Sequence, residues 1–208
     1  ALMLISLISV FQAGTASAQG KPNPTFATVD MTDPYNPTTP SAEISIGWEH
    51  EPAIENVPLS GTDAIHVTTS QPTSDYAMVV VPTNFTLENG TEISYWGYTV
   101  SGDVKAPDEI FLFLDTDSDG TVDNLLTSHK PGGAASEYYG KWDNWSFNDT
   151  ANQWHTAIPY TEVLLADFTD NGYTVLAIAL TAGPSTAGLP VSVDVYFDNL
   201  TVNGDVLL

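Results

Sequence analysis

The segment Glu109-Ile-Phe-Leu-Phe-Leu-Asp-Thr-Asp-Ser-Asp-Gly-Thr-Val-Asp123 joins an apolar run to an acidic loop. Its first half is rich in aromatic and aliphatic residues, which favours a β-strand. Its second half places aspartates at loop positions 1, 3, 5 and 9 and a glycine at position 6, as in the first part of a calcium-binding loop. A strand that leads directly into such a loop predicts a β-protein with a metal-binding turn.

Calcium is the cation that this loop fits, because it prefers carboxylate and carbonyl oxygens as ligands. Gly120 allows the sharp bend, and Leu126 stands where an EF-hand would carry a bidentate glutamate. The loop is therefore expected to hold a structural calcium ion rather than to act as a sensor. The alternative is a solvated turn, since Asp, Ser and Gly are common turn residues. The expected ligands are Asp115, Asp117, Asp119, the carbonyl of Thr121, and Asp123.

The chain as a whole is strongly acidic. Its 208 residues include 26 acids against four lysines, for a formal net charge of -22, and arginine is absent. This composition argues against nucleic acid as a partner, because phosphate binding needs cationic side chains. Cysteine is also absent, which excludes disulfides and thiol catalysis. The apolar content of 42% is enough for one domain with a single core.

Residues 1–18 form an apolar N-terminal segment with two interpretations. An Ala-Ser-Ala sequence precedes Gln19, as at the cleavage site of a secretory signal. A retained segment would instead need a partner. As a strand with two apolar faces it could insert into a neighbouring subunit, and as a helix it resembles the filament core of type IV pilin-like subunits. The assembly residues would be Leu2, Leu4, Ile5, Leu7, Ile8, Val10 and Phe11.

The rest of the chain divides into an arm and a domain. Residues 19–41 are rich in Pro and Thr and are expected to form an extended arm, with a candidate strand at Phe26–Met31. Residues 42–208 alternate short apolar runs with turn residues, which is typical of a β-sandwich. Only Tyr160–Phe168 is expected to be helical. The strand candidates are Ala42–Trp48, Ala64–Thr68, Tyr76–Val81, Glu92–Ser101, Glu109–Leu114, Tyr173–Leu180 and Val191–Val202.

Three segments carry a family resemblance. The segment Ile93-Ser-Tyr-Trp-Gly-Tyr98, the Asp-rich turn, and the closing Val195-Tyr-Phe-Asp-Asn-Leu-Thr-Val-Asn-Gly204 resemble jelly-roll sandwiches of the carbohydrate-binding-module and concanavalin-like group. The resemblance implies an all-β jelly-roll β-sandwich. It also implies that an acid in the last strand, Asp198, ligates a structural calcium ion with an acid near the first strand. An Asx-turn is the alternative role of Asp198.

A second resemblance concerns assembly. An acidic, cysteine-free β-sandwich with an Asp-rich loop and an apolar N-terminal segment is similar to the secreted subunits of archaeal extracellular tubes (cannulae) and bundling pili. Those subunits assemble by donor-strand exchange, which implies copies of the chain itself as partners.

Aromatic residues and sequons mark two further kinds of candidate site. Exposed aromatic rings stack on sugars or fill subunit interfaces, and the alternative is that they pack the region 131–155 onto the core. The tryptophans concerned are Trp142, Trp145 and Trp154. The candidate N-glycosylation sites of a secreted protein are Asn84, Asn89, Asn144, Asn148 and Asn199.

Catalysis is not expected from this sequence. It contains no nucleophile elbow, phosphate-binding loop or zinc-protease helix motif. The first hypothesis is a secreted, calcium-binding structural subunit that self-assembles into an extracellular filament, tube or surface array through its apolar N-terminal segment. The alternative is a non-catalytic carbohydrate-binding module of a secreted or cell-surface protein, with glycans as partners.

Overall fold

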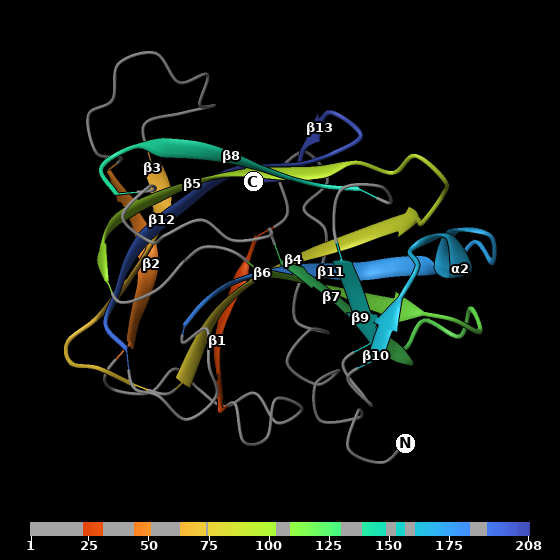
Figure 1. Ribbon diagram of the computed structural model, residues 1–208, viewed down its shortest axis with the longest axis horizontal. Helices are drawn as coiled ribbons and strands as arrows, with labels where there is room; N and C mark the ends of the chain where they lie inside the picture. Colours follow the sequence, from red (N-terminus) through yellow and green to blue (C-terminus); the bar gives the residue numbers. More distant parts are fainter. Residues whose placement is uncertain are drawn as a thin grey trace.

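The fold is seen in a computed structural model of the chain. It describes residues 23–30, 44–50, 63–73, 75–102, 109–129, 139–148, 153–156, 161–183 and 191–208. These residues form two antiparallel β-sheets that pack as a jelly-roll β-sandwich (Figure 1). The assembly residues between Leu2 and Phe11 lie outside the described residues.

The first sheet has seven strands, in the spatial order β1-β4-β11-β6-β7-β9-β10. The strand β11 pairs with β4 on one side and β6 on the other, with an irregularity between Val175 and Ala177 in both registers. The bounds are β1 (Thr25–Asp30), β4 (Asp75–Thr86), β11 (Thr174–Ala182), β6 (Glu109–Asp115), β7 (Asn124–His129), β9 (Gln153–Thr156) and β10 (Thr161–Val163).

The second sheet has the order β2-β3-β12-β5-β8, and a short strand β13 pairs with β12. Successive strands cross repeatedly between the two sheets, so residues far apart in sequence become neighbours. The bounds are β2 (Ile44–His50), β3 (Asp63–Thr69), β12 (Val193–Val202), β5 (Ile93–Gly102), β8 (Trp142–Phe147) and β13 (Asp205–Val206). In Figure 1, β2, β3 and β12 lie toward the left, whereas β7, β9 and β10 lie toward the centre and right.

The main hydrophobic core is formed by residues of both sheets. Tyr95 is fully buried there, with Trp145 and Phe147 in stacked orientations at ring-centroid distances of 6.3 and 5.8 Å. Each large side chain buried in this way contributes on the order of 2 kcal/mol of hydrophobic free energy. Alternate residues of β4 face opposite sides, and Val80 belongs to a second cluster beyond the seven-stranded sheet. The sheet is therefore apolar on both faces at its centre.

The all-β expectation is confirmed, and the strand candidates from 42 onward correspond to β2, β3, β4, β5, β6, β11 and β12. The candidate strand in the arm is β1, which pairs with β4 along the sheet edge. The prediction for Tyr160–Phe168 was wrong in extent. Its first part is β10, and only α2 (Ala166–Thr169) is helical. Cross-strand pairing to Trp154 and His155 overrides the local helical pattern there.

Among the residues that the structure describes, no helix is long and apolar enough to cross a membrane.

Candidate functional site

The acidic loop between β6 and β7 is organised by its own backbone. Asp115, at the end of β6, is buried, and its carboxylate accepts hydrogen bonds from the N–H groups of Ser118 (2.7 Å) and Gly120 (2.9 Å). Gly120 has φ of 84°, a left-handed conformation that glycine adopts without strain, as the sequence predicted. Asp123 closes the loop by accepting from the backbone N–H of Thr116 at 2.8 Å.

Three carboxylates of this loop are close enough to share a cation. One oxygen each of Asp115, Asp117 and Asp123 lies within 4.8 Å of the others. This all-oxygen donor set fits calcium in chemical type. Asp119 does not join the group, and its carboxylate instead accepts from the backbone N–H of Thr121 at 2.8 Å.

The electrostatics of the loop distinguish two of its exposed acids, Asp117 and Asp119. Desolvation raises the pKa of Asp117, and repulsion from Asp119, Asp123 and Asp115 adds to the rise, against one backbone hydrogen bond. The hydroxyl and N–H of Thr121 hold the pKa of Asp119 below its usual value. The pKa values of these two acids are thus shifted in opposite directions.

Asp198 lies on β12 of the other sheet, where it is 2% exposed. It is not part of the carboxylate group formed by Asp115, Asp117 and Asp123. The structure therefore brings three of the expected metal ligands together and leaves Asp198 separate from them.

A row of aromatic side chains crosses the outer face of the second sheet. In register, Tyr196 pairs with both His66 and Tyr98, and Tyr98 also pairs with Trp142. The residues that alternate with them along the strands, such as Val67, Tyr95 and Val195, belong to the core. His66, Tyr98 and Tyr196 therefore face the opposite side of the sheet. We call His66, Tyr196, Tyr98 and Trp142 the aromatic row.

The rings of the aromatic row contact one another in sequence. His66 and Tyr196 are stacked, with centroids 4.1 Å apart and planes 3° from parallel. Tyr98 meets Tyr196 edge-on at 6.3 Å and Trp142 at 5.6 Å with a tilt of 50°. Tyr98 and Tyr196 remain partly exposed, whereas Trp142 is 6% exposed. Among described residues, Nε1 of Trp142 has no hydrogen-bond partner.

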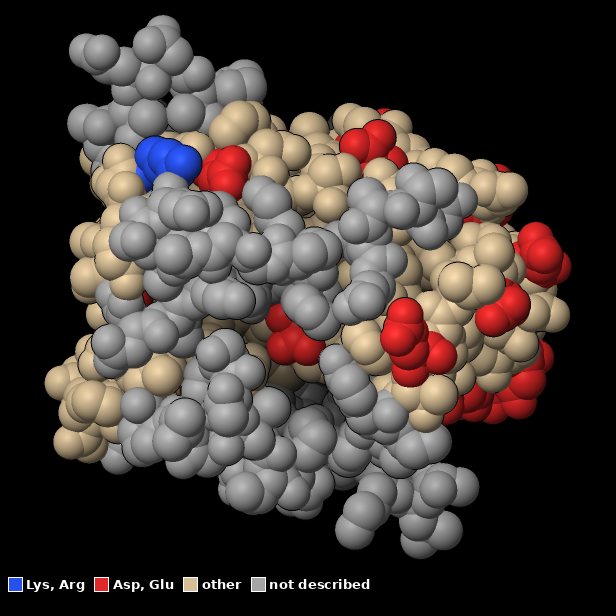
Figure 2. Space-filling view, in the orientation of Figure 1, with Lys and Arg blue, Asp and Glu red and all other residues tan. Residues whose placement is uncertain are grey.

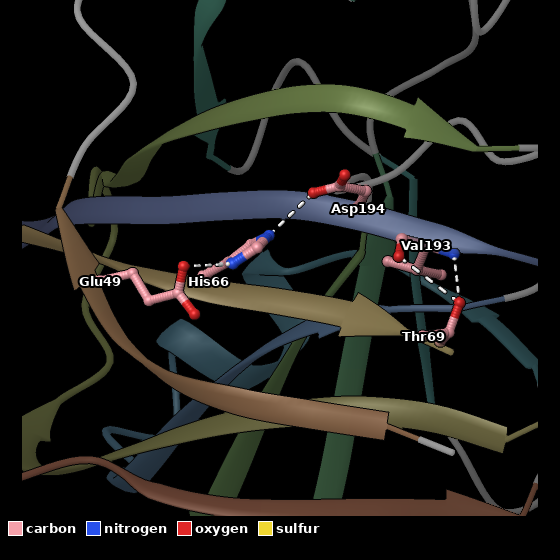
Figure 3. A network of polar contacts seen from close by, with 5 residues as sticks. All are labelled: Glu49, His66, Thr69, Val193 and Asp194. Carbon is pink, nitrogen blue, oxygen red and sulfur yellow. Dashed lines mark hydrogen bonds and ion pairs between the residues drawn. The ribbon is translucent and has the colours of Figure 1, made fainter. Parts of the chain in front are cut away.

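His66 lies between two carboxylates at one end of the aromatic row (Figure 3). Its Nδ1 is 2.9 Å from Oε2 of Glu49, and its Nε2 is 2.8 Å from Oδ1 of Asp194. We call Glu49, His66 and Asp194 the His66 clamp. Loss of hydration raises the pKa of the neighbouring Tyr196, and the charges of Glu49 and Asp194 raise it further.

The remaining candidate residues are the tryptophans Trp145 and Trp154 and the asparagines of the sequons. Trp145 and Trp154 are each 1% exposed and belong to the core, as the packing alternative expects, and Nε1 of Trp154 donates to the carbonyl of Asn148 at 3.0 Å. Of the sequons, three asparagines are exposed and two are partly buried. The exposed ones are Asn84, Asn89 and Asn144, and the others are Asn148 and Asn199.

Most of the aromatic row and the whole His66 clamp were not predicted from the sequence. The period-2 pattern at Tyr95–Tyr98 places one set of aromatic rings in the core and the other on the outer face, which was a usable signal. No local signal joins Glu49, His66 and Asp194, because 128 residues separate His66 from Asp194.

Acidic side chains form separate patches on the surface of the molecule (Figure 2). Figure 2 shows them over the visible face, most densely toward the right. Lys141 is the single lysine in the part of the chain that the structure describes.

No protein-family model matches the chain, and no curated protein matches it. One similar solved structure is the family 11 carbohydrate-binding module of cellulosomal cellulase Lic26A-Cel5E of Clostridium thermocellum. It is 11% identical with a TM-score of 0.48, covering 92% of this chain and 94% of that chain. Another is the family 11 carbohydrate-binding module from Clostridium thermocellum in complex with a β-1,3-1,4-mixed-linked tetrasaccharide. It is 12% identical with a TM-score of 0.43, covering 93% and 95%. At this level of similarity, function has to be inferred from the chain's own residues.

Proposed function

We propose that this protein is a non-catalytic, secreted carbohydrate-binding module that holds a neutral glycan on the outer face of its second sheet. The observation that carries the proposal is the aromatic row, a continuous set of rings that ends at the unpaired Nε1 of Trp142 among described residues. Aromatic rings match the apolar C–H faces of sugars. A buried N–H without a partner is costly unless a ligand or water accepts from it.

The next positions on the same face add both an aromatic and a polar surface. Trp96 is partly exposed and pairs in register with Asn144, which is exposed. Asn144 offers both a donor and an acceptor to sugar hydroxyl groups. A face that combines rings with neutral hydrogen-bonding groups suits a polysaccharide chain rather than an isolated ion.

The charge of this face selects the class of glycan. The acidic groups along the aromatic row are Glu49 and Asp194, with His66 between them, and Asp198, which pairs in register with Trp96. Lys141 adjoins Trp142 in the chain. Together with a net charge of -22, this arrangement disfavours uronate or sulfate polymers through like-charge repulsion. Neutral glycans avoid that repulsion.

The test is retention of the protein by a panel of polysaccharides in affinity electrophoresis. The panel contains hydroxyethylcellulose, mixed-linkage β-glucan, xylan, glucomannan and starch as neutral members, with polygalacturonate as the anionic member. We expect retention by at least one neutral polymer and none by polygalacturonate. Absence of retention by all neutral members would contradict the proposal.

Two variants locate the binding face. Tyr98→Ala removes the ring at the centre of the aromatic row and should abolish retention, while Trp142→Phe keeps a ring but removes the Nε1 donor and should weaken it. Trp48→Ala is the matched control, because Trp48 is 49% exposed on β2 of the same sheet and outside the row. Equal retention of Tyr98→Ala and Trp48→Ala would place binding elsewhere.

We also propose that the β6–β7 loop binds calcium as a structural ion. The supporting observation is the group of Asp115, Asp117 and Asp123, whose oxygens lie within 4.8 Å of one another. A cation bound only to the folded loop stabilises the fold by mass action. Calcium should therefore raise the melting temperature and give a calorimetric binding signal. Asp117→Asn should weaken both effects, and Asp205→Asn, on the exposed strand β13, should not.

Self-assembly through the apolar segment 1–18 stays a prediction, because that segment lies outside the described residues. Electron microscopy with calcium and with chelator, together with mass spectrometry of the mature N-terminus, tests it. Filaments that persist after deletion of residues 1–18 would contradict the role given to that segment.

A further inference from the structure

We propose that Glu49 and Asp194 hold His66 as a doubly protonated imidazolium that positions Tyr196, so that glycan affinity falls as the pH rises. This inference deepens the proposed function and rests on it for the effect on affinity. His66 acts here as a positioning residue, because it works through the ring that it stacks against.

The proton count follows from the two contacts. Both ring nitrogens of His66 lie within hydrogen-bond distance of carboxylate oxygens, at 2.9 and 2.8 Å. A neutral imidazole has one N–H, so the other nitrogen would present a lone pair to a carboxylate that also has only lone pairs. Both contacts are hydrogen bonds at once only when the group of three side chains carries one additional proton. The imidazolium form supplies it and makes both contacts charge-assisted.

The strand register explains why the two carboxylates reach opposite sides of one ring. Glu49 pairs with Ala64 and Asp194 pairs with Thr68, so they lie diagonally before and after His66 on the same face. Figure 3 shows Glu49 and Asp194 approaching the ring from opposite directions. The ring is therefore fixed at both nitrogens by two different strands, β2 and β12.

Fixing the ring of His66 also orients its stacking partner. The planes of His66 and Tyr196 are 3° from parallel at a centroid distance of 4.1 Å. A cation over the face of a tyrosine ring is attracted to it. Loss of one proton from the clamp removes this attraction and one of the two hydrogen bonds, so Tyr196 is less firmly placed beside Tyr98 in the aromatic row.

The groups that face His66 set the direction of the effect. They are Glu49 on β2 and Asp194 and Tyr196 on β12. Tyr98 on β5 meets Tyr196, and the exposed pair His50 and Asp63 lies farther along β2 and β3 at a separation of 3.7 Å. With both protons on His66, the clamp carries a net charge of minus one, and without the second proton it carries minus two. The extra negative charge favours release of Glu49, whose side chain is 55% exposed, into water. The complete clamp is thus the acid-side form, and it is lost as the pH rises.

The first arm of the experiment measures the clamp without any glycan. Nitrogen-detected NMR of the imidazole rings, followed from about pH 5 to about pH 9, reports whether His66 carries one proton or two. We expect two protons on the acid side and a coincident change in the ring signals of Tyr196. A ring of His66 that carries a single proton throughout this range would overturn the inference, whatever the glycan data show.

The second arm measures affinity for the neutral polysaccharide of the panel that retains the wild-type protein most strongly. We expect about tenfold weaker binding at the alkaline end than at the acid end, the equivalent of one lost charge-assisted contact. His66→Gln should bind weakly at both ends of the range. His66→Arg should bind with a flat pH profile, because a guanidinium keeps its donors and its charge.

Two further variants keep the test decisive. Glu49→Gln should flatten the profile, since an amide can donate to a neutral His66 where a carboxylate cannot. His50→Gln is the control, because His50 is 81% exposed and should leave the profile unchanged. A wild-type profile in both His66→Gln and Glu49→Gln would overturn the inference. Absence of binding at every pH, with a doubly protonated His66, would instead overturn the proposed function and leave the clamp established.

Discussion

The β6–β7 loop and the His66 clamp both collect carboxylates, but they satisfy them in opposite ways. In the loop, Asp115 and Asp123 accept hydrogen bonds from backbone N–H groups no more than seven residues away. In the clamp, Glu49 and Asp194 meet the ring of a histidine that is 17 and 128 residues distant. The loop therefore depends on local chain geometry, whereas the clamp depends on strand register.

This difference indicates what each arrangement of carboxylates can do. A loop whose acids are held by its own backbone stays formed while its exposed oxygens remain available to a cation. In the His66 clamp, side chains from three strands meet, and we propose that the protonation of His66 affects how Tyr196 is placed in the aromatic row. The four variants below comprise three changes in these two arrangements and one at a carboxylate outside both, and they run from the largest expected change in stability to the smallest.

Asp115→Ala should have the largest effect. It removes a buried carboxylate and leaves the N–H groups of Ser118 and Gly120 without their acceptor, which costs about 3 kcal/mol. Urea unfolding in the presence of chelator measures this change. Asp115→Asn, which keeps one acceptor oxygen, should cost less. If Asp115→Ala lost less unfolding free energy than Asp115→Asn, the loop would not depend on these hydrogen bonds.

Asp194→Ala should cost about 1.5 kcal/mol on the acid side, because it removes one charge-assisted partner of His66. The cost should shrink as the pH rises, since the clamp is complete only while His66 carries both protons. Unfolding curves at several pH values, compared with a double mutant at His66, measure the coupling. A cost that is constant with pH would contradict the proton count of the clamp.

Glu109→Gln tests a carboxylate that belongs neither to the β6–β7 loop nor to the His66 clamp. Burial raises the pKa of Glu109, and the hydroxyl of Thr127, at 2.7 Å, only partly opposes this. The folded state therefore favours the neutral acid, so wild-type stability should increase as the pH falls from neutral through the raised pKa. The amide keeps an acceptor for Thr127 without the charge, and should add about 1 kcal/mol at neutral pH. Thermal unfolding at two pH values measures both effects.

Glu49→Gln should have the smallest effect on stability, below about 0.5 kcal/mol, because Glu49 is 55% exposed and water replaces its contact. Differential scanning calorimetry measures it. A loss as large as that of Asp194→Ala would mean that the two sides of the clamp are equivalent in spite of their exposure.

Much of the fold could be predicted from local patterns. The alternation in Ala42–Trp48 and the apolar run before Asp115 correspond to β2 and β6, because burial of one face or both faces leaves a direct mark on composition. The strands β7, β8, β9, β10 and β13 were not predicted. They are short or polar in places, and neighbouring strands rather than their own propensity hold them in the sheet.

The candidate sites divide in the same way. The approach of Asp115, Asp117 and Asp123 follows from loop spacing, and the structure has it. For the tryptophans the sequence left two roles open, and Trp145 and Trp154 lie in the core, as the packing alternative expects. Tyr98 and Tyr196, which form the outer row, were not predicted as site residues. Composition shows that a region is aromatic, but only the register decides which rings face out.

The sequence by itself determined an acidic, cysteine-free β-protein with an Asp-rich turn after a strand, because charge, composition and turn chemistry are properties of neighbouring residues. Tertiary structure alone decided that His66 lies between Glu49 and Asp194 and stacks on Tyr196. The physical reason is that pairing between β2, β3 and β12 brings together residues whose separation along the chain carries no information about their distance in space.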